Sequence, residues 1–402
     1  MESCNQVERT GKGMPDSASG GDTPLPGAVP GDFNMFGRRP LALLGSLVVA
    51  LTLPAAAYAQ DICTTPASLI NSGAGKDAIP ALLNPQVLTA AEGDLIWRSD
   101  DRVLGVVING EARAYPMPIM WWHEIVNDHL GGSRITLSYC PLTGSGLVFN
   151  PVVDGDFRTF GTSGLLYENN LVMYDRGKGQ SLWPQLDETA VCDTAAEGQV
   201  LSLLPVVETS WGAWRRMHPD TTVVSRNTGH RRDYDVYPYG DYDELHNDFL
   251  LYPQSFIDPR LPMKDLVFGV RHDGSALAFS HTRLAARGER LVLNHTMGAL
   301  RMAIVWDRAN GLVLGFDRRP LVRKRNGKWK FKTLKLELVE DDAGFPFVLR
   351  DKRSKTTFTL SGEVIEGKLA DRIENGRLEP LADSYTAFWF AWATFYRGTE
   401  IY

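Results

Sequence analysis

The sequence has few cysteines, no excess of positive charge and no apolar run long enough to cross a membrane. Its 402 residues include 42 basic and 48 acidic ones, and the net charge of −6 argues against a nucleic-acid partner. The longest apolar run, 41–53, would form a helix of roughly 20 Å, shorter than the roughly 30 Å core of a bilayer. We therefore expect no transmembrane span in the mature chain, and its partners stay unknown.

The composition is otherwise that of a globular protein. Hydrophobic residues make up 44% of the chain and charged residues 22%, which excludes a disordered chain. With 38 glycines and 23 prolines, the sequence is typical of many turns and short strands. We predict an α+β fold that is mainly antiparallel β.

The N-terminal region has the pattern of an export signal. Arg38-Arg39 precedes the apolar run, and Ala57-Tyr58-Ala59 follows it as an A-x-A cleavage signal. We expect a signal peptide over 35–59, with Met35 as the true start. Residues 1–34 are Gly-, Pro- and Ser-rich, so we interpret them as a disordered extension or a misassigned start. The mature protein would be periplasmic or extracellular.

Processing would leave three cysteines in an oxidising compartment. Cys63 and Cys192 stand in polar, turn-like surroundings, and we predict that they form a disulfide. Cys140 would keep a free thiol at the end of an apolar strand, 135–139.

Two segments of the mature chain resemble each other. Residues 101–115 match 265–279 at seven of 15 positions, and each copy has a hairpin signal, Asn109-Gly110 or Asp273-Gly274. The copies also end alike, because four residues recur at an offset of 178: Leu203, Trp211, Trp214 and Thr221 match Leu381, Trp389, Trp392 and Thr399. We predict two related lobes that arose by internal duplication, with the tryptophans in the core.

This repeat sets the expected organisation of the chain. An N-terminal segment (60–100) precedes the first lobe (101–230), and an aromatic, proline-rich connection (231–264), hereafter the arm, leads to the second lobe (265–402). Within the first lobe, a helix is expected over 118–129, ending before Gly131-Gly132. Strands are expected at 135–139 and 146–149, and a long one at 329–338.

Several motifs together resemble the DUF3179 family, which is named for having no assigned function and contains exported or membrane-associated bacterial and archaeal proteins. The resemblance covers about residues 78 to 402. The motifs that carry it are Trp122-His-Glu-Ile-Val-Asn-Asp128, Tyr139-Cys-Pro-Leu-Thr-Gly-Ser-Gly146, Gly161-Thr-Ser-Gly-Leu-Leu-Tyr167, Leu171-Val-Met-Tyr-Asp175, His218-Pro-Asp-Thr221 and Phe388-Trp-Phe-Ala-Trp392. Many relatives have a second cysteine where this chain has Thr143. The resemblance therefore implies no two-thiol redox or metal site here.

Cys140 and His123 are the candidate catalytic residues. A thiol where a strand meets a Gly-rich turn is placed to act as a nucleophile or a soft-metal ligand. His123, on the expected helix, would serve as base or second ligand, and a Cys–His pair suits copper or zinc. Either residue can instead be buried core, and the metal, if any, is unknown.

Four polar residues near these two are candidates for binding a substrate. They are Tyr139, Thr143, Ser145 and Ser163, of which the last three lie in or beside Gly-rich turns.

Two functions stay open from the sequence. One is an exported enzyme or metal protein with a site around Cys140 and His123. The other is a non-catalytic binding or scaffold protein of the cell envelope.

Overall fold

A computed structural model describes residues 66–177, 179–192, 196–339 and 344–402. The expected disordered extension, the signal peptide and Cys63 lie outside the described residues. Within them, short strands predominate over a few short helices, and nearly all strand pairs are antiparallel. The prediction of an α+β, mainly antiparallel β fold is confirmed.

The first lobe begins with the predicted hairpin. Its turn residues Asn109 and Gly110 both have positive φ, as a type I′ turn requires. The hairpin lies in a five-stranded sheet with the order β15 (Val207–Ser210), β4 (Arg102–Ile108), β5 (Glu111–Pro116), β16 (Thr222–Val224) and β3 (Val87–Thr89). Helix α1 (Ala90–Gly93) follows β3.

The helix after this hairpin is shorter than predicted. Helix α2 (Met117–His123) ends where Glu124 adopts a φ of 55°, and the expected helical residues beyond it form strand β6 (Ile125–Leu130). The β-branched pair Ile125 and Val126 instead faces Ser138 and Leu137 across an antiparallel ladder. Gly131-Gly132 is thus the turn of a second hairpin and not a helix cap.

This second hairpin belongs to the sheet that carries Cys140. The sheet has the order β14 (Ser202–Leu204), β8 (Ser145–Asn150), β7 (Ser133–Cys140), β6 and β2 (Leu82–Leu83). The strands predicted at 135–139 and 146–149 are confirmed as parts of β7 and β8.

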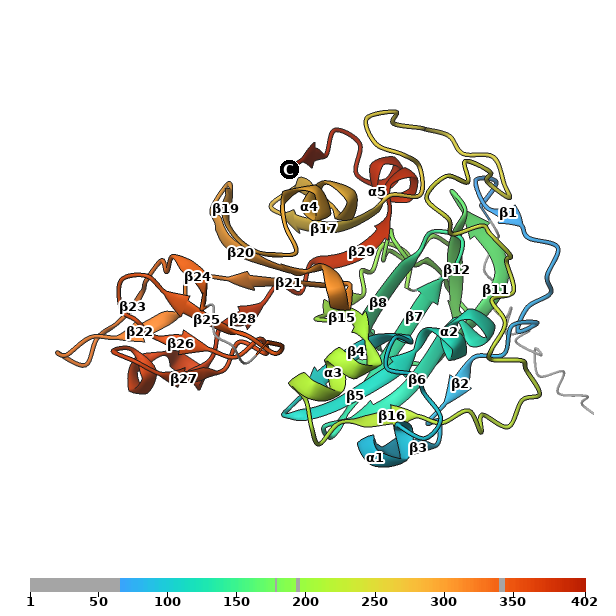
Figure 1. The fold of residues 1–402 in the computed structure, drawn as a ribbon. Coiled ribbons are helices and arrows are strands. Elements are labelled where there is room, and N and C mark those ends of the chain that lie inside the picture. Colours follow the sequence, from blue (N-terminus) through green and yellow to red (C-terminus); the bar gives the residue numbers. More distant parts are fainter. Residues whose placement is uncertain (1–65, 178, 193–195, 340–343) are drawn as a thin grey trace, which may run out of the picture. The chain divides into compact units, whose positions relative to one another are not determined.

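A further sheet joins β1 (Ile70–Asn71), from the N-terminal segment, to three strands that lie between β8 and β14 in the chain. Its order is β1, β11 (Phe160–Tyr167), β12 (Asn170–Asp175) and β13 (Leu182–Pro184), and β9 (Val152–Val153) pairs separately with β10 (Asp156–Phe157). Figure 1 shows β11 and β12 side by side.

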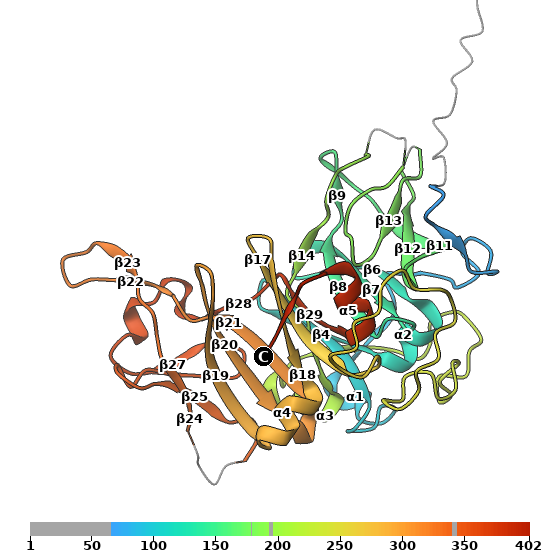
Figure 2. The ribbon, with the colours of Figure 1, turned by 90° about the horizontal axis from the view of Figure 1, so that it is seen from above.

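The second lobe repeats the strand order of the first. One sheet has the order β29 (Ser384–Phe388), β17 (Leu266–His272), β18 (Ser275–Ser280) and β30 (Glu400–Ile401). The other has the order β19 (Arg290–Met297), β20 (Leu300–Asp307), β21 (Leu312–Asp317) and β28 (Glu379–Pro380), and Figure 2 shows its first three strands side by side.

Helices also occupy matching places in the two lobes. Helix α4 (His281–Arg287) follows β18 as α2 follows β5, and α5 (Trp389–Phe395) matches α3 (Trp211–Met217). In both lobes the last strand pairs in parallel with the second strand of the hairpin. A shared strand order is what a duplication would leave behind, and the duplication itself stays a prediction.

The second lobe contains an insert between β21 and β28. Here β22 (Leu321–Arg323) pairs with β23 (Trp329–Phe331), and the other strands are β24 (Leu336–Val339), β25 (Val348–Asp351), β26 (Thr357–Phe358) and β27 (Val364–Glu366). The long strand expected at 329–338 is therefore two strands in different sheets. Short 3-10 turns lie at Arg308–Asn310, Ala370–Arg372 and Glu374–Gly376.

The arm contains no helix or strand and runs past α2 on its way from β16 to β17 (Figure 1). Aromatic residues hold it in place: the Trp122 indole N–H donates to the Val236 carbonyl, and the Trp121 and Tyr237 rings meet edge to face. The four tryptophans assigned to the core by sequence, Trp211, Trp214, Trp389 and Trp392, are all buried, which confirms that prediction.

Candidate functional site

His123 joins the end of α2 to the arm. Its Nδ1 lies 2.7 Å from the Pro80 carbonyl oxygen, and its Nε2 lies 2.7 Å from the Tyr234 hydroxyl. Because a carbonyl can only accept, Nδ1 carries the proton and Nε2 accepts from Tyr234. Burial lowers the pKa of His123 to about 4, so the imidazole is neutral at physiological pH.

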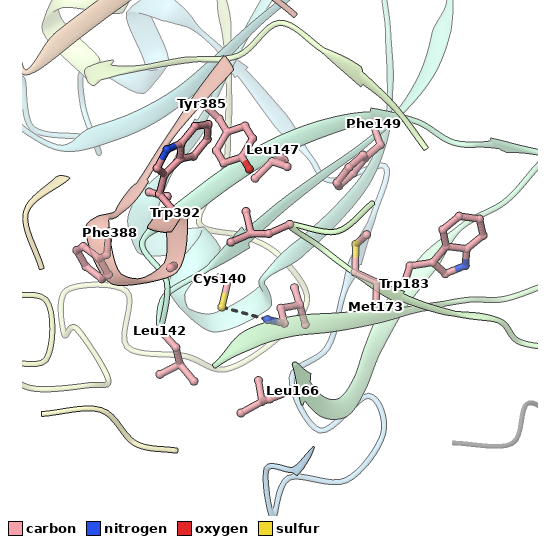
Figure 3. Packing of buried hydrophobic residues seen from close by; sticks show 14 of the residues in the cluster. Cys140, Leu142, Leu147, Phe149, Leu166, Met173, Trp183, Tyr385, Phe388 and Trp392 are labelled. Carbon is pink, nitrogen blue, oxygen red and sulfur yellow. Dashed lines mark hydrogen bonds between the residues drawn. The ribbon is translucent and has the colours of Figure 1, made fainter. Parts of the chain in front are cut away.

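Cys140 ends β7 inside an apolar cluster. Its Sγ accepts from the Leu171 N–H at 3.3 Å and lies 3.7 Å from the Asn169 carbonyl oxygen. Figure 3 shows it among Leu142, Leu166 and Phe388. Burial first, and then the charge of Glu124, raise the pKa of the thiol to about 11. The thiol is therefore protonated at neutral pH and is not activated as a nucleophile.

The two candidate catalytic residues are not hydrogen-bonded to each other. Both ring nitrogens of His123 have other partners, and so does the Cys140 sulfur. Within the described ranges, no group of three or more His, Cys, Asp or Glu residues has an arrangement that could hold a metal ion. The geometry thus gives the predicted pair no shared site.

Two of the predicted substrate-binding residues belong to a buried polar network. Thr143 Oγ1 and Ser145 Oγ lie 2.8 Å apart, and Ser145 donates to Gln185 Oε1 at 2.8 Å. Asn170 Nδ2 donates to both Thr143 and Gln185, and Gln185 Nε2 donates to Ser138. Because these side chains are fully buried and bond one another across two sheets, the network contributes to the fold.

The other two predicted binding residues are also engaged in the fold. Tyr139 is buried, and burial raises the pKa of its hydroxyl to about 12. Ser163 lies at the bulge of β11, where its Oγ donates to the Val172 carbonyl at 2.5 Å and accepts from the Leu165 N–H. Its neighbour Thr162 lines a cavity, whereas Ser163 does not.

Glu124 is a candidate residue that the sequence analysis missed. It is buried at the junction of α2 and β6, and its carbonyl accepts from the Tyr139 N–H at 2.7 Å. The Tyr239 hydroxyl lies 3.5 Å from Oε1, and burial raises the pKa of the carboxyl to about 8. The carboxyl is thus mostly protonated at neutral pH. The sequence feature that could have pointed to Glu124 is its place inside the motif Trp122-His-Glu-Ile. When this motif is interpreted as part of a helix, Glu124 has no special position.

Glu124 lines a cavity of about 150 Å³ between the N-terminal segment, the first lobe and the arm. Most of its wall is apolar, and the hydroxyl groups of Thr162, Tyr239 and Tyr252 add polar points. The remaining lining residues are Ser72, Ala74, Gly75, Ile79, Leu142, Gly164, Leu165, Leu166, Leu171 and Leu251. An apolar cavity with a few convergent polar groups and a perturbed pKa is the usual form of a ligand site.

The arm supplies one side of this cavity. The Tyr252 hydroxyl donates to the Ser72 carbonyl at 2.8 Å, and Tyr252 N–H donates to Asn169 Oδ1. The Tyr242 hydroxyl donates to the Leu142 carbonyl at 3.1 Å. These bonds fasten the aromatic arm over β11 and β7, so the cavity depends on the arm's position.

Of the two cysteines in the predicted disulfide, Cys192 lies within the described residues. Cys192 is disulfide-bonded, and its sulfur accepts from the Leu182 N–H at 3.2 Å. Because Cys63 lies outside the described residues, the pairing stays a prediction. Peptide mapping of the unreduced protein would test it.

Comparison with known proteins identifies the family but not an activity. A family model, described as protein of unknown function (DUF3179), matches residues 76–399, so the chain belongs to this family. No curated protein and no solved structure matches the chain. In the part of the chain that the structure describes, no helix is long and apolar enough to span a membrane.

Proposed function

We propose that this chain is an exported protein that binds a small molecule in the cavity beside Glu124. The molecule would have an apolar body and one hydrogen-bond acceptor. A buried glutamate with a raised pKa that lines a mostly apolar cavity is the observation that carries the proposal.

The dimensions and chemistry of the cavity support this ligand class. A cavity of 150 Å³ lined by leucine-like side chains holds benzene, so the ligand would have about six non-hydrogen atoms. The neutral Glu124 carboxyl would donate a hydrogen bond to its acceptor, and Tyr239 and Tyr252 would border its apolar body, since the Tyr252 hydroxyl already donates to the Ser72 carbonyl.

Binding is better supported than a reaction centred on Cys140 and His123. Both of those residues are buried and already hydrogen-bonded, and burial favours the neutral form of each. A reactive thiol or a copper or zinc site there would require the two side chains to move. Thiol titration and metal analysis of the purified mature protein remain the direct tests of that alternative.

Export is supported by the sequence alone. The Arg38-Arg39 pair, the apolar run 41–53 and Ala57-Tyr58-Ala59 have the order of a signal peptide. Expressed in a bacterial host with its own leader, the protein should appear outside the cytoplasm with Gln60 as its first residue. N-terminal sequencing that found Met1 or Met35 on the mature chain would contradict export by this signal.

Binding can be tested with a set of neutral cyclic amides and ketones of about six non-hydrogen atoms. Saturation-transfer NMR on the full mature chain should detect binding of members of this set. Glu124→Leu should abolish it, because it removes the hydrogen-bond donor, whereas Glu124→Gln keeps a donor and should retain it.

Glu188→Gln is the matched control. Glu188 is another buried glutamate with a raised pKa, but it does not line the cavity. Binding that survives Glu124→Leu, or that is lost equally in Glu188→Gln, would contradict the proposed site. Thermal unfolding of each variant checks that it is folded.

A further inference from the structure

We infer that a second pocket, between the two lobes and the insert, binds a small organic carboxylate. It is separate from the Glu124 cavity and shares no residue with it. Its volume is about 140 Å³, and Arg377 from the insert is the cation in its wall.

The walls of this pocket are mostly apolar and come from three parts of the chain. The first lobe contributes the face of the β4–β15 pair with the Trp214 ring, the second lobe contributes Phe268 and 313–316, and the insert contributes Leu360. Such walls would hold an aliphatic or aromatic body and exclude a strongly hydrated ligand.

Arg377 has no hydrogen-bonding partner for its buried Nε among the described residues. Glu363 also lines the pocket and its backbone forms an isolated antiparallel bridge with that of Arg377, but its side chain is exposed and the two side chains form no ion pair. A buried donor without an acceptor is costly, and a bound carboxylate oxygen would satisfy it. The planar guanidinium group is also the preferred partner of a carboxylate.

His218 faces the same space as Arg377. Its ring lies on the Trp214 ring with centroids 4.2 Å apart, and its Nε2 is 3.4 Å from Ser361 Oγ. Burial, and then the charge of Arg377, lower the pKa of His218 to about 4. The pocket thus contains one cation beside a neutral imidazole, and the exposed Glu363 is the acidic residue of its lining, so it suits a monoanion better than a phosphate with two charges.

The corresponding place in the second lobe is chemically different. Tyr396, at the position equivalent to His218, donates to the Leu186 carbonyl at 2.9 Å. Arg271, the cation beside it, is already ion-paired with Glu188 at 2.7 Å. Of these two places, the one with Arg377 is therefore the one whose arginine forms no ion pair with an acidic side chain in the described part of the chain.

The test uses three probes that share a fluorobenzene ring, which would fill a pocket of this volume while the polar group reaches Arg377: 4-fluorobenzoate, 4-fluorobenzyl alcohol and 4-fluorobenzylamine. Fluorine NMR on the full mature chain should show the benzoate binding at least about tenfold more tightly than the other two. Only the benzoate carries a negative charge, so only it can form an ion pair with the guanidinium group of Arg377. Arg377→Gln should reduce benzoate affinity to that of the alcohol.

Matched variants distinguish a loss of benzoate binding at Arg377 from unfolding of the protein and from binding in the Glu124 cavity. Arg372 is another arginine of the insert; its Nε donates to the Arg323 carbonyl, and it does not line the pocket. The Arg372→Gln variant should therefore bind benzoate as tightly as the wild type. Glu124→Leu should do the same. Val207→Phe puts a larger side chain into the part of the wall that β15 contributes and should abolish binding.

Equal affinity for benzoate and the alcohol would overturn the inference, as would unchanged benzoate affinity in a folded Arg377→Gln. If Arg377→Gln fails to fold, Val207→Phe decides, since retained benzoate binding there would also overturn it. Either result leaves the proposal for the Glu124 cavity standing.

Discussion

Burial determines the charge of three ionisable residues near the arm. Glu124 and Cys140 hold their protons, and His123 has lost its own, because each charged form would lose its hydration. The site beside the arm is therefore neutral at pH 7, although its residues are the types that usually carry charge or act as nucleophiles.

The state of Cys140 leads to a prediction about its reactivity. Because the thiol is buried with a pKa near 11, it should react with a disulfide reagent at pH 8 far more slowly in the native protein than after unfolding in guanidinium. The difference between the wild type and Cys140→Ser isolates this residue. A native thiol that reacts within seconds would restore Cys140 as a candidate nucleophile.

Glu124 should make stability depend on pH. Its folded pKa of about 8 exceeds the model-peptide value of 4.5, so the folded state binds more protons between these values and stability falls as pH rises through them. The loss at pH 9 relative to pH 4.5 should be on the order of 4 kcal/mol. Glu124→Gln cannot ionise and should lack this loss in denaturant titrations at the two pH values. Parallel pH profiles of both proteins would disprove the assignment.

Sequence reasoning located part of this site. Cys140 was expected at the end of a strand, and it lies there, because alternating residues specify a strand locally. Glu124 was missed because its role depends on a backbone turn with positive φ that ends the helix early. The cavity also needs Tyr239 and Tyr252, and their distance from Glu124 along the chain leaves no sequence signal for their proximity.

At the scale of elements, a glycine–tryptophan contact recurs in both lobes. Gly105 of β4 lies under the Trp214 ring, and Gly269 of β17 lies under the Trp392 ring. Each indole N–H also donates to a threonine hydroxyl seven residues later, Thr221 or Thr399. The contact lets the helix pack directly on the hairpin strand.

This contact predicts the effect of adding one methyl group. A Cβ at Gly105 or Gly269 would stand 2.2 or 2.1 Å from the tryptophan ring, so Gly105→Ala and Gly269→Ala should each destabilise by about 1–3 kcal/mol. Gly75→Ala is the control, since nothing lies within 4 Å of its added Cβ. The measurement is chemical denaturation. Wild-type stability in both lobe variants would mean that the rings move aside freely.

Some elements follow from the sequence and others do not. The hairpin at Asn109-Gly110 was predicted because its turn is specified by two adjacent residues. The helix expected over 118–129 was wrong after His123, since β pairing of Ile125 and Val126 with β7 outweighs their apolar spacing. The path of the arm was not predictable, because it is fastened by single side-chain bonds and has no periodicity.

For the whole molecule, five buried groups set the pH of greatest stability. The histidines His123, His218 and His281 have pKa values lowered by burial to about 4, 4 and 3, and burial raises those of Glu124 and Glu188 to about 8 and 7. Below pH 6.5 the unfolded histidines bind protons that the folded ones do not, so stability rises with pH. The two glutamates act in the opposite direction from pH 4.5 upward.

Among these five groups, three histidines oppose two glutamates up to pH 6.5, and above it the glutamates act alone until about pH 8, where Lys264, whose pKa burial lowers to about 8, begins to act in the opposite direction. These groups therefore place the maximum of stability near pH 6.5, with each group contributing a slope of about 1.4 kcal/mol per pH unit where it is active. Unfolding free energies measured from pH 4 to pH 8 check this. Stability that still rises at pH 8 would mean that the glutamates are ionised in the folded state.

Because Glu124 has a positive φ, the residue that would make position 124 most stable differs from the residue that the proposed binding requires. Glycine tolerates that backbone conformation, a φ of 55° with a ψ of −33°, better than glutamate does, and it would not bury a carboxyl there. A library of all residues at position 124, sorted for heat resistance, should become enriched in glycine. The same library sorted for retention of a cyclic amide should keep glutamate or glutamine, and such a divergence would mark position 124 as one kept for binding at the expense of stability.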